Sequence, residues 1–333
     1  MGRAQLQRQS PQPRPAQPRQ SRALVRLSPE LGPRADPAHP GSLCRALAST
    51  MLTNPAHEPA NLWVVTDLDG TLLDHHYDWS AAKTTLTWLK QIGISVIPCT
   101  SKTAEEVRRF RRDAELDGPF IVENGGAILG GTDAQAWEQG LGSSHAVLRD
   151  QLSTLAVVTD TPLTALEDLT PEQVTDLTGL QGEAIQMAQQ RQWSVPFLNP
   201  PSDRQSLVQQ EATRLNLTVV QGNRMSHLLQ AGTSKGAALD ALKQKLQQGD
   251  VHVIALGDSP NDLPLLHAGD HSVVVPGPKG PHPRLAEFIR EGRFALAPAP
   301  HAAGWACSVI AYVKARVSPT LAASAPAPPL DWP

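Results

Sequence analysis

The sequence predicts an α/β fold in which a parallel-sheet core carries a second, inserted α+β module. Short apolar strands alternate with helices in two separate stretches of the chain, and the strands near residues 64 and 251 each run into Gly and Asp residues. Between about residues 141 and 230 the pattern changes, because helices alternate there with isolated strands that end in no acidic cluster. We therefore expect a core of residues 60–140 and 231–316, interrupted by a module of residues 141–230.

The composition predicts a soluble, cytoplasmic protein. With 333 residues, of which 40% are hydrophobic, the chain can bury a substantial core. The net charge of −3 offers no support for binding to nucleic acid or to an acidic membrane, and no segment approaches the roughly 20 apolar residues of a spanning helix. Three cysteines, Cys44, Cys99 and Cys307, are odd in number and far apart, which is typical of a reducing compartment.

Both ends of the chain have the composition of unstructured segments. Residues 1–59 are rich in Pro, Gln, Arg and Ser, with the first acidic residue at Glu30, so they cannot bury enough apolar surface to offset the entropy of ordering. A transit peptide would share this Arg-rich character but should also be amphipathic, and another alternative is that Met51 is the true initiator. The Ala/Pro-rich residues 317–333 are likewise expected to be unstructured.

The first half of the core reads as strand, helix, strand, helix, strand, which is the order of a parallel sheet. Gly93 is placed to end the first helix, and Thr103 can cap the second because Glu106 follows three residues later. The predicted strands begin near residue 62 and span 94–98 and 120–122, and the helices span 80–91 and 104–112.

The second half of the core resumes the same alternation after the insertion. The inserted module is predicted to hold helices over 146–155, 171–177, 183–191 and 202–216 and a strand over 217–221. The core then continues with helices over 235–246 and 263–268 and strands over 251–256 and 271–275.

Two acidic residues, Asp67 and Asp69, follow the first buried strand. The carboxyl end of a strand is where open parallel sheets bind their ligands. Neither carboxylate has a Lys or Arg within several residues to neutralise it, which favours a divalent cation as the partner.

A second acidic cluster lies near the other end of the chain, where a buried strand runs into Gly257, Asp258 and, four residues later, Asp262. Two clusters so far apart in sequence can converge only if their strands are neighbours in one sheet. That convergence would make a magnesium site.

Four short motifs occur in order along the chain: Asp67-Leu68-Asp69-Gly70-Thr71, Thr100-Ser101-Lys102-Thr103, Lys235-Gly236 and Gly257-Asp258-Ser259-Pro260-Asn261-Asp262. In these motifs the chain resembles the haloacid dehalogenase superfamily. Phe120-Ile121-Val122-Glu123-Asn124-Gly125-Gly126 resembles the ENG segment of the Cof-type (IIB cap) branch. Similarity to the mannosyl-3-phosphoglycerate phosphatase family comes from residues 98–103, 177–180, 275–278 and Gly304-Trp305. The resemblance implies a Rossmann-like core with an α+β cap.

For catalysis, the resemblance implies that Asp67 is a nucleophile that forms an aspartyl-phosphate. Asp69 would protonate the leaving oxygen and then activate water. The resemblance also implies a cofactor, Mg²⁺, held by the Asp67 and Asp258 carboxylates and the Asp69 backbone carbonyl, with Asp262 acting through water or by orienting its neighbours.

The phosphate oxygens need further donors beyond the metal. Lys235 would supply a charge, and Thr100 a hydroxyl, with Ser101 contributing through its backbone. Asn261 could hold Lys235 or phosphate. A solvated lysine at a helix N-terminus is the alternative for Lys235, and Lys102 carries a weaker prediction because a loop lysine is usually just exposed.

Substrate selectivity is expected to come from the inserted module. Arg191, Arg224 and His227 are candidates to read a carboxylate and sugar hydroxyls, with surface charge or a structural hydrogen bond as the alternatives. Glu123 and Asn124 would shape the floor near the leaving group.

One departure from the family pattern concerns the sugar. Ser194-Val195-Pro196-Phe197 stands where the family usually has an acidic residue before Pro-Phe, which leaves the identity of the sugar open.

The function implied by the resemblance is hydrolysis of mannosyl-3-phosphoglycerate to mannosylglycerate, a compatible solute, and phosphate. The expected binding partner is thus its substrate, a small phosphorylated sugar-glycerate. The sequence gives no information on the oligomeric state. Alternatives are a phosphatase of glucosyl-3-phosphoglycerate or another sugar phosphate, a phosphomutase, and a non-catalytic regulator that keeps the fold.

Overall fold

The computed structural model describes residues 58–222 and 224–329 of the chain. The predictions made for residues 1–57, including the alternative start at Met51, lie outside these residues. No helix in the described part of the chain is long and apolar enough to cross a membrane.

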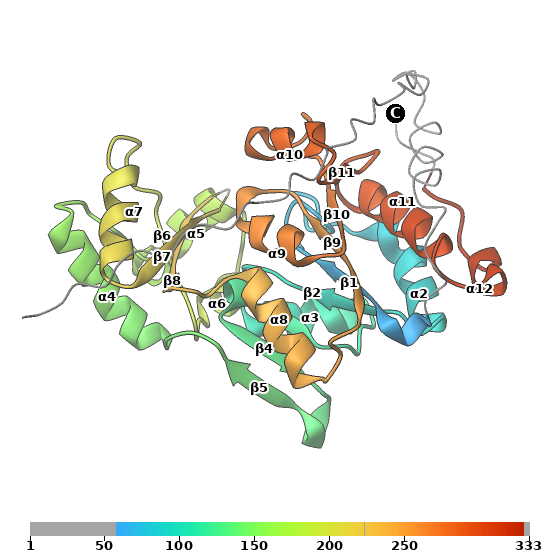
Figure 1. Cartoon of the computed structure of the whole chain (residues 1–333). Helices are drawn as coiled ribbons and strands as arrows, with labels where there is room; N and C mark the ends of the chain where they lie inside the picture. Colours follow the sequence, from blue (N-terminus) through green and yellow to red (C-terminus); the bar gives the residue numbers. More distant parts are fainter. Residues whose placement is uncertain (1–57, 223, 330–333) are drawn as a thin grey trace, which may run out of the picture. The chain divides into compact units, whose positions relative to one another are not determined.

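The core is a five-stranded sheet whose pairings are all parallel (Figure 1). Its strand order is β11 (Ala295–Leu296), β10 (His271–Val274), β9 (His252–Gly257), β1 (Leu62–Thr66) and β2 (Ser95–Pro98). The first strand in the sequence therefore lies in the sheet between β2 and β9, with Val64 opposite Ile254. The predicted α/β class with a parallel sheet is confirmed, and the two strands that precede the acidic clusters are neighbours.

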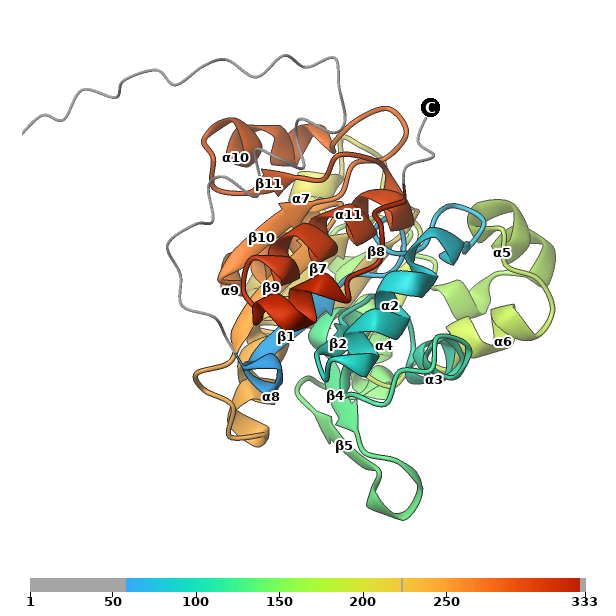
Figure 2. The same cartoon turned by 90° about the vertical axis from the view of Figure 1, so that its right-hand side faces the viewer.

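Helices cover both faces of this sheet because alternate residues of β1 point to opposite sides. Val64 packs into one apolar cluster with residues of α2 (Lys83–Gln91), α3 (Ala104–Asp113) and α11 (His301–Lys314). Trp63 and Val65 pack into a second cluster with residues of α8 (Lys235–Lys245) and α9 (Leu263–Ala268). Figure 2 shows α2 and α11 together on the near side of β1. The remaining helix of this part is α10 (Ala286–Arg290).

The third predicted strand differs from expectation. Phe120–Val122 (β3) does not continue the parallel sheet as a full strand but forms an antiparallel sheet with β4 (Ala127–Gly130) and β5 (Trp137–Gly140). A single parallel bridge, Cys99 to Ile121, joins it to the end of β2. The chain reverses at once after β3, so β3 can pair with β4 only in the antiparallel sense, since a parallel neighbour needs a long crossover.

The inserted module (residues 141–230) combines four helices with an antiparallel sheet of order β6-β8-β7. Its helices are α4 (His145–Val158), α5 (Pro171–Thr178), α6 (Glu183–Gln189) and α7 (Gln205–Arg214), and its strands are β6 (Val195–Phe197), β7 (Leu217–Gln221) and β8 (Ser226–Gln230). Leu148, Leu152 and Phe197 belong to its own apolar cluster. The module therefore has a core separate from the two clusters on the parallel sheet.

The C-terminal segment corrects one expectation. Residues 317–333 were expected to be unstructured, yet Pro319–Ala323 form helix α12, and Leu321 packs against the cluster that contains Val64. The indole N–H of Trp88 donates to Ser324 Oγ at 3.0 Å. The small apolar side chains of this segment find a surface to cover, which composition alone does not reveal.

Candidate active site

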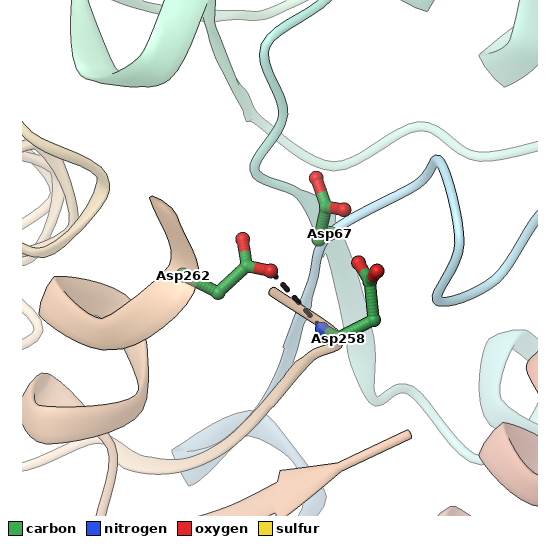
Figure 3. A group of neighbouring side chains, drawn as sticks. All are labelled: Asp67, Asp258 and Asp262. Carbon is green, nitrogen blue, oxygen red and sulfur yellow. Dashed lines mark hydrogen bonds between the residues drawn. The ribbon is translucent and has the colours of Figure 1, made fainter. Parts of the chain in front are cut away.

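The acidic residues at the ends of β1 and β9 converge (Figure 3). One carboxylate oxygen from each of Asp67, Asp258 and Asp262 lies within 4.8 Å of the others. The Asp67 N–H donates to Leu256 O at 2.9 Å, so the pairing of β1 with β9 extends to this residue. Parallel pairing thus brings together two segments separated by most of the core sequence.

Lys235 lies inside this group of carboxylates. Its Nζ is 2.6 Å from Asp67 Oδ1 and 2.5 Å from Asp262 Oδ1, and its side chain is fully buried. Burial alone would lower the pKa of this ammonium group, but the two carboxylates hold that pKa above its usual range. No Lys or Arg lies within several residues of Asp67 in the sequence, and the cation that pairs with it comes from a distant segment.

Three carboxylates around one ammonium group leave the site short of positive charge. Burial is the largest cause that raises the pKa of Asp67 to about 7, although Lys235 acts in the opposite direction. Burial and the nearby carboxylates of Asp262 and Asp67 also raise the pKa of Asp258 well above its usual range. A further cation would relieve this crowding of like charges.

The Asp262 carboxylate has partners on both oxygens. Oδ1 accepts from Lys235, while Oδ2 accepts from the backbone N–H groups of Asp258 and Ser259, each at 3.0 Å; Figure 3 draws the bond to Asp258. Asp258, in contrast, accepts at Oδ1 from the Thr71 hydroxyl at 3.2 Å. Asp262 therefore shapes the turn that presents Asp258.

Asp69 lies apart from the three clustered carboxylates. Its side chain is 42% exposed, and Oδ2 is 3.1 Å from Lys102 Nζ. Gly70 must follow it, because a Cβ at this position would lie 2.6 Å from Asp258 Oδ2 and φ is +86°. Only the backbone carbonyl of Asp69 is left for the metal-binding role that the resemblance implies, and that role stays a prediction.

The turn after β2 places its two hydroxyl residues differently. Thr100 is fully buried; its N–H donates to Ile121 O at 3.1 Å, and its Oγ1 accepts from the Lys102 N–H at 3.3 Å. Ser101 lines the cavity above the acidic residues. Of the two residues, Ser101 lines this cavity, and the role of the Thr100 hydroxyl stays a prediction.

A cavity lies between the core and the inserted module. The core lines it with Asp67, Asp69, Gly70, Asp74, His75, Tyr77, Ser101, Lys102, Glu106, Ser259 and Asn261. The inserted module lines it with Leu166, Thr178, Leu180, Ala188, Arg191, Pro196, Gly222, Arg224, Met225 and His227. All three residues of the inserted module that the sequence put forward thus share one cavity with Asp67 and Asp69.

The two arginines of this cavity are held by backbone carbonyls. Arg191 Nη1 donates to Ser101 O at 2.6 Å, and its Nε donates to Ala188 O at 2.8 Å. Arg224 Nη1 donates to Thr178 O. The carbonyl partners neutralise no charge, so the Arg224 guanidinium keeps its attraction for an anionic ligand. Arg191 Nη2 also lies 3.9 Å from Glu106 Oε2, and this carboxylate offsets part of its charge.

His227 is a neutral imidazole at ordinary pH. Burial lowers its pKa to about 3, and the positive charges of Arg191 and Lys235 act in the same direction. Its Nδ1 is buried and has no hydrogen-bond partner among the described residues. Such an atom is suited to a hydroxyl group of a ligand.

Glu123 joins the core to the inserted module rather than lining the cavity. Its carboxylate accepts from the N–H groups of Gln192 at 2.9 Å and Trp193 at 3.1 Å and from Ser194 Oγ at 2.6 Å. The structure thus gives Glu123 a set of partners other than the leaving group that the sequence analysis expected.

Asn124 and Asn261 form a pair next to this junction. Asn261 Nδ2 donates to Asn124 Oδ1 at 3.4 Å, and Asn124 has a left-handed backbone with φ of +57°. Asn261 reaches the cavity, whereas Asn124 is 2% exposed and its Nδ2 has no partner among the described residues. Asn124 therefore does not line the cavity itself but contacts Asn261, which does.

Sequence reasoning underrated Lys102 and missed Tyr77 and Glu106. The Lys102 side chain is only 11% exposed, lies 3.2 Å from Glu106 Oε1 and sits 4.7 Å above the Tyr77 ring. The capping box of Thr103 and Glu106, which is confirmed, was the available signal, because it fixes the Glu106 carboxylate beside Lys102.

The family comparison agrees with the motifs. A family model described as haloacid dehalogenase-like hydrolase matches residues 64–141 and 185–276, which together make up more than half of the chain.

Solved structures are similar in fold at low identity. X-ray structures that show conservation of a trigonal-bipyramidal intermediate in a phosphoryl-transfer superfamily reach a TM-score of 0.58 at 11% identity, covering 76% of this chain and 98% of that chain. The sucrose-phosphatase of a Synechocystis species, in complex with sucrose and phosphate, has a TM-score of 0.52, 18% identity and coverage of 76% and 98%. A haloacid dehalogenase-like hydrolase of B. subtilis has a TM-score of 0.52, 17% identity and coverage of 71% and 94%. These likenesses show the fold.

Proposed function

This chain belongs to the haloacid dehalogenase-like hydrolases, and on that premise we propose that it is a Mg²⁺-dependent phosphatase of mannosyl-3-phosphoglycerate. The products would be mannosylglycerate and phosphate. One observation carries the proposal: the buried pair of Asp67 and Lys235 lies in a group of carboxylates at the floor of a cavity that also holds Asp69 and two arginines.

Asp67 is the nucleophile. Lys235 holds Oδ1, which leaves Oδ2 to attack the phosphorus atom in line with the leaving oxygen. The new bond joins Asp67 to phosphorus, and the bond that breaks joins phosphorus to the glycerate oxygen. Water then attacks the aspartyl-phosphate, which releases phosphate and restores the carboxylate.

Asp69 moves the proton in both steps. It gives a proton to the departing glycerate oxygen and takes one from the attacking water, so the residue returns to its starting state. Lys102 holds its carboxylate at the cavity, 3.1 Å from Nζ. The two acids therefore have separate environments, one buried beside Lys235 and one exposed to the ligand.

The residues present fit a magnesium ion. They offer hard oxygen ligands in a group short of positive charge, and Asp258 accepts there from the hydroxyl of Thr71. Asp67 and Asp258 would hold the ion, with Asp262 orienting Asp258. When bound, Mg²⁺ would supply positive charge to the transferring phosphoryl oxygens.

The sugar-glycerate part of the substrate is proposed on the chemistry of the inserted module. Arg191 and Arg224 offer positive charge to the glycerate carboxylate, and His227 Nδ1 offers a bond to a sugar hydroxyl. The likeness to a sucrose-phosphatase supports a phosphorylated sugar as the substrate class. Ser194 and Val195 stand where the family usually has an acidic residue before Pro-Phe, and the Ser194 hydroxyl donates to the Glu123 carboxylate. An acidic side chain in place of Ser194 would bring two carboxylates together. Because this departure leaves the identity of the sugar open, glucosyl-3-phosphoglycerate and other sugar phosphates are the alternatives.

A substrate panel tests the proposal. Phosphate release is measured with mannosyl-3-phosphoglycerate, glucosyl-3-phosphoglycerate and simple hexose phosphates, each with MgCl₂ and with EDTA. We expect the highest kcat/KM for mannosyl-3-phosphoglycerate and no turnover in EDTA. A higher kcat/KM for a hexose phosphate than for either glycosyl-phosphoglycerate would overturn the proposed substrate, while turnover in EDTA would overturn the metal.

A further inference from the structure

Helix α11 contacts both ends of the segment that carries Asp67 and Asp69. Trp305 Nε1 donates to Thr66 Oγ1 at 2.9 Å, and His301 Nδ1 lies 2.9 Å from Gly70 O. The two side chains are four residues apart, so they lie on the same face of the helix. Neither belongs to the four superfamily motifs, although Trp305 is part of the Gly304-Trp305 pair cited above for similarity to the phosphatase family.

At the Thr66 end the contact continues into the nucleophile. The Thr66 hydroxyl donates to Asp67 O at 2.7 Å and accepts from the Trp305 indole, and both Thr66 and Trp305 are fully buried. Burial thus fixes the Thr66 side chain and the Trp305 indole, and the Thr66 hydroxyl in turn holds the Asp67 carbonyl.

At the other end, His301 contacts the backbone of Gly70, a position with no room for a side chain. A Cβ on Gly70 would collide with the Asp258 carboxylate, so Gly70 has only its backbone to hold it in place. Its carbonyl is an acceptor, and the His301 Nδ1 that meets it must therefore carry a proton and donate. Without this bond, the residue after Asp69 would keep only its own turn contacts.

The backbone of α11 is strained at His301, the residue that contacts Gly70. The φ of His301 is +49°, in the left-handed region that non-glycine residues seldom adopt, and His301 is the first residue of the helix. A Cβ on Gly304 would lie 1.6 Å from Ala299 O, so the first turn closes tightly over the preceding residues. Strain of this kind persists where the surrounding structure requires it, and it is common at functional sites.

We propose that His301 and Trp305 are positioning residues, which hold the Thr66–Gly70 segment at both ends and so fix Asp67 and Asp69 relative to each other. The inference rests on the proposed phosphatase reaction, in which these two acids act on the same phosphoryl group. Neither His301 nor Trp305 lines the cavity. Their loss should therefore lower kcat and leave KM nearly unchanged, since a misplacement of about 1 Å can cost roughly 100-fold in rate.

Three substitutions at one position separate the hydrogen bond from the backbone strain. His301→Leu removes the donor. His301→Gly also removes the donor but adopts a positive φ without strain. His301→Asn tolerates a positive φ and can place its Nδ2 donor near the former Nδ1. We expect kcat to fall by roughly 10- to 100-fold in the Leu and Gly variants and to recover to within about threefold of wild type in the Asn variant.

Thr66 offers a matched pair at the other end. Thr66→Val keeps the shape and removes the hydroxyl, whereas Thr66→Ser keeps the hydroxyl. We expect Val to lower kcat by roughly tenfold or more at unchanged KM and Ser to retain kcat within about threefold. The melting temperature of each variant shows whether the fold is retained.

A readout independent of activity keeps this inference separate from the proposed function. The sequence contains three Gly-Thr pairs, at residues 70–71, 131–132 and 232–233, so labelling glycine carbonyls with ¹³C and threonine amides with ¹⁵N yields three correlated signals. We expect one signal, that of Gly70, to shift in the Leu and Gly variants and to return toward wild type in the Asn variant. If wild-type protein dephosphorylates no substrate while this signal behaves as expected, the proposed function fails and the contact stands.

Three results would overturn the inference itself. The first is an unchanged set of three carbonyl signals in His301→Leu. The second is a kcat of His301→Leu or Thr66→Val equal to wild type, in an enzyme that is active. The third is a kcat of His301→Asn no higher than that of His301→Gly, which would show that the donor has no role.

Discussion

Lys235 donates to Asp67 from a position where both side chains are almost wholly buried, at 2.6 Å between Nζ and Oδ1. The same ammonium group donates to Asp262. One lysine therefore donates to two buried carboxylates, and the nucleophile keeps one oxygen outside this arrangement. This relationship connects catalysis with stability, because changing Lys235 leaves both acids without their cation.

Lys235→Met should abolish turnover and destabilise the fold. Removing one partner of a buried ion pair costs about 3–5 kcal/mol, because the remaining charges stay buried without compensation. Urea unfolding at pH 7 measures the loss. Lys243→Met, on the same helix, is the control and should change stability by less than about 0.5 kcal/mol. Equal stability of the two variants would contradict the account.

Asp258→Asn should separate the effect of repulsion between carboxylates on the melting temperature from the effect of metal binding. The raised pKa of Asp258 means that its ionised form is disfavoured in the folded state, so a neutral side chain should raise the melting temperature in EDTA. MgCl₂ should then stabilise wild type and have little effect on the variant, because a ligand has been removed.

The control for this metal experiment is Asp250→Asn, at an exposed position. It should respond to MgCl₂ as wild type does. An equal Mg²⁺-dependent shift in Asp258→Asn would remove Asp258 from the metal site.

Glu123→Gln should loosen the junction between core and inserted module. The ionised carboxylate accepts from Gln192, Trp193 and Ser194, and an amide has one acceptor oxygen in place of two. We expect faster hydrogen exchange of the Gln192 and Trp193 amides and a loss of about 1–3 kcal/mol in stability.

Glu115→Gln serves as the control for the junction, because its side chain is 81% exposed. Its exchange at Gln192 and Trp193 should match wild type. Unchanged exchange in Glu123→Gln would mean that the module is held by other contacts.

The pair of His145 and Glu167 should make stability depend on pH. His145 Nε2 lies 2.9 Å from Glu167 Oε1, and this bond raises the pKa of His145 above its ordinary value. The imidazolium therefore contributes stability that is fully present below about pH 6.5, the unfolded pKa, and is lost as pH rises through the folded pKa. The two side chains are 24% and 27% exposed, so solvent screening should keep the contribution below about 1 kcal/mol.

His145→Gln measures this contribution, because glutamine does not titrate. The free energy of unfolding of wild type minus that of the variant should be larger at pH 5.5 than at pH 8.5. A difference that grows with pH would show that the ion pair does not stabilise the fold.

Much of the core could be predicted from the sequence because its signals are local. Apolar runs that end in Gly and Asp mark β1 and β9, and the spacing of Thr103 and Glu106 marks the start of α3. The convergence of Asp67 with Asp258 follows from parallel pairing, which the alternation of elements predicts.

The parts that escaped prediction depend on tertiary contacts. Helix α11 reads as an almost continuous apolar run without an amphipathic pattern, because ten of its residues are buried. The position of Lys102 depends on Asp69 and Glu106, and the partners of Glu123 belong to a segment about seventy residues away. Such pairings carry no signal in local spacing.

The location of the phosphoryl group during turnover tests the central claim most directly. Wild-type enzyme is quenched in acid during hydrolysis, the acyl phosphate is reduced with borohydride, and the modified residue is identified by peptide mass spectrometry. The account predicts modification at Asp67 alone, and in Asp67→Asn no modification and a fall in kcat of about 10⁴-fold or more. Modification at another residue, or turnover of Asp67→Asn near the wild-type rate, would contradict it.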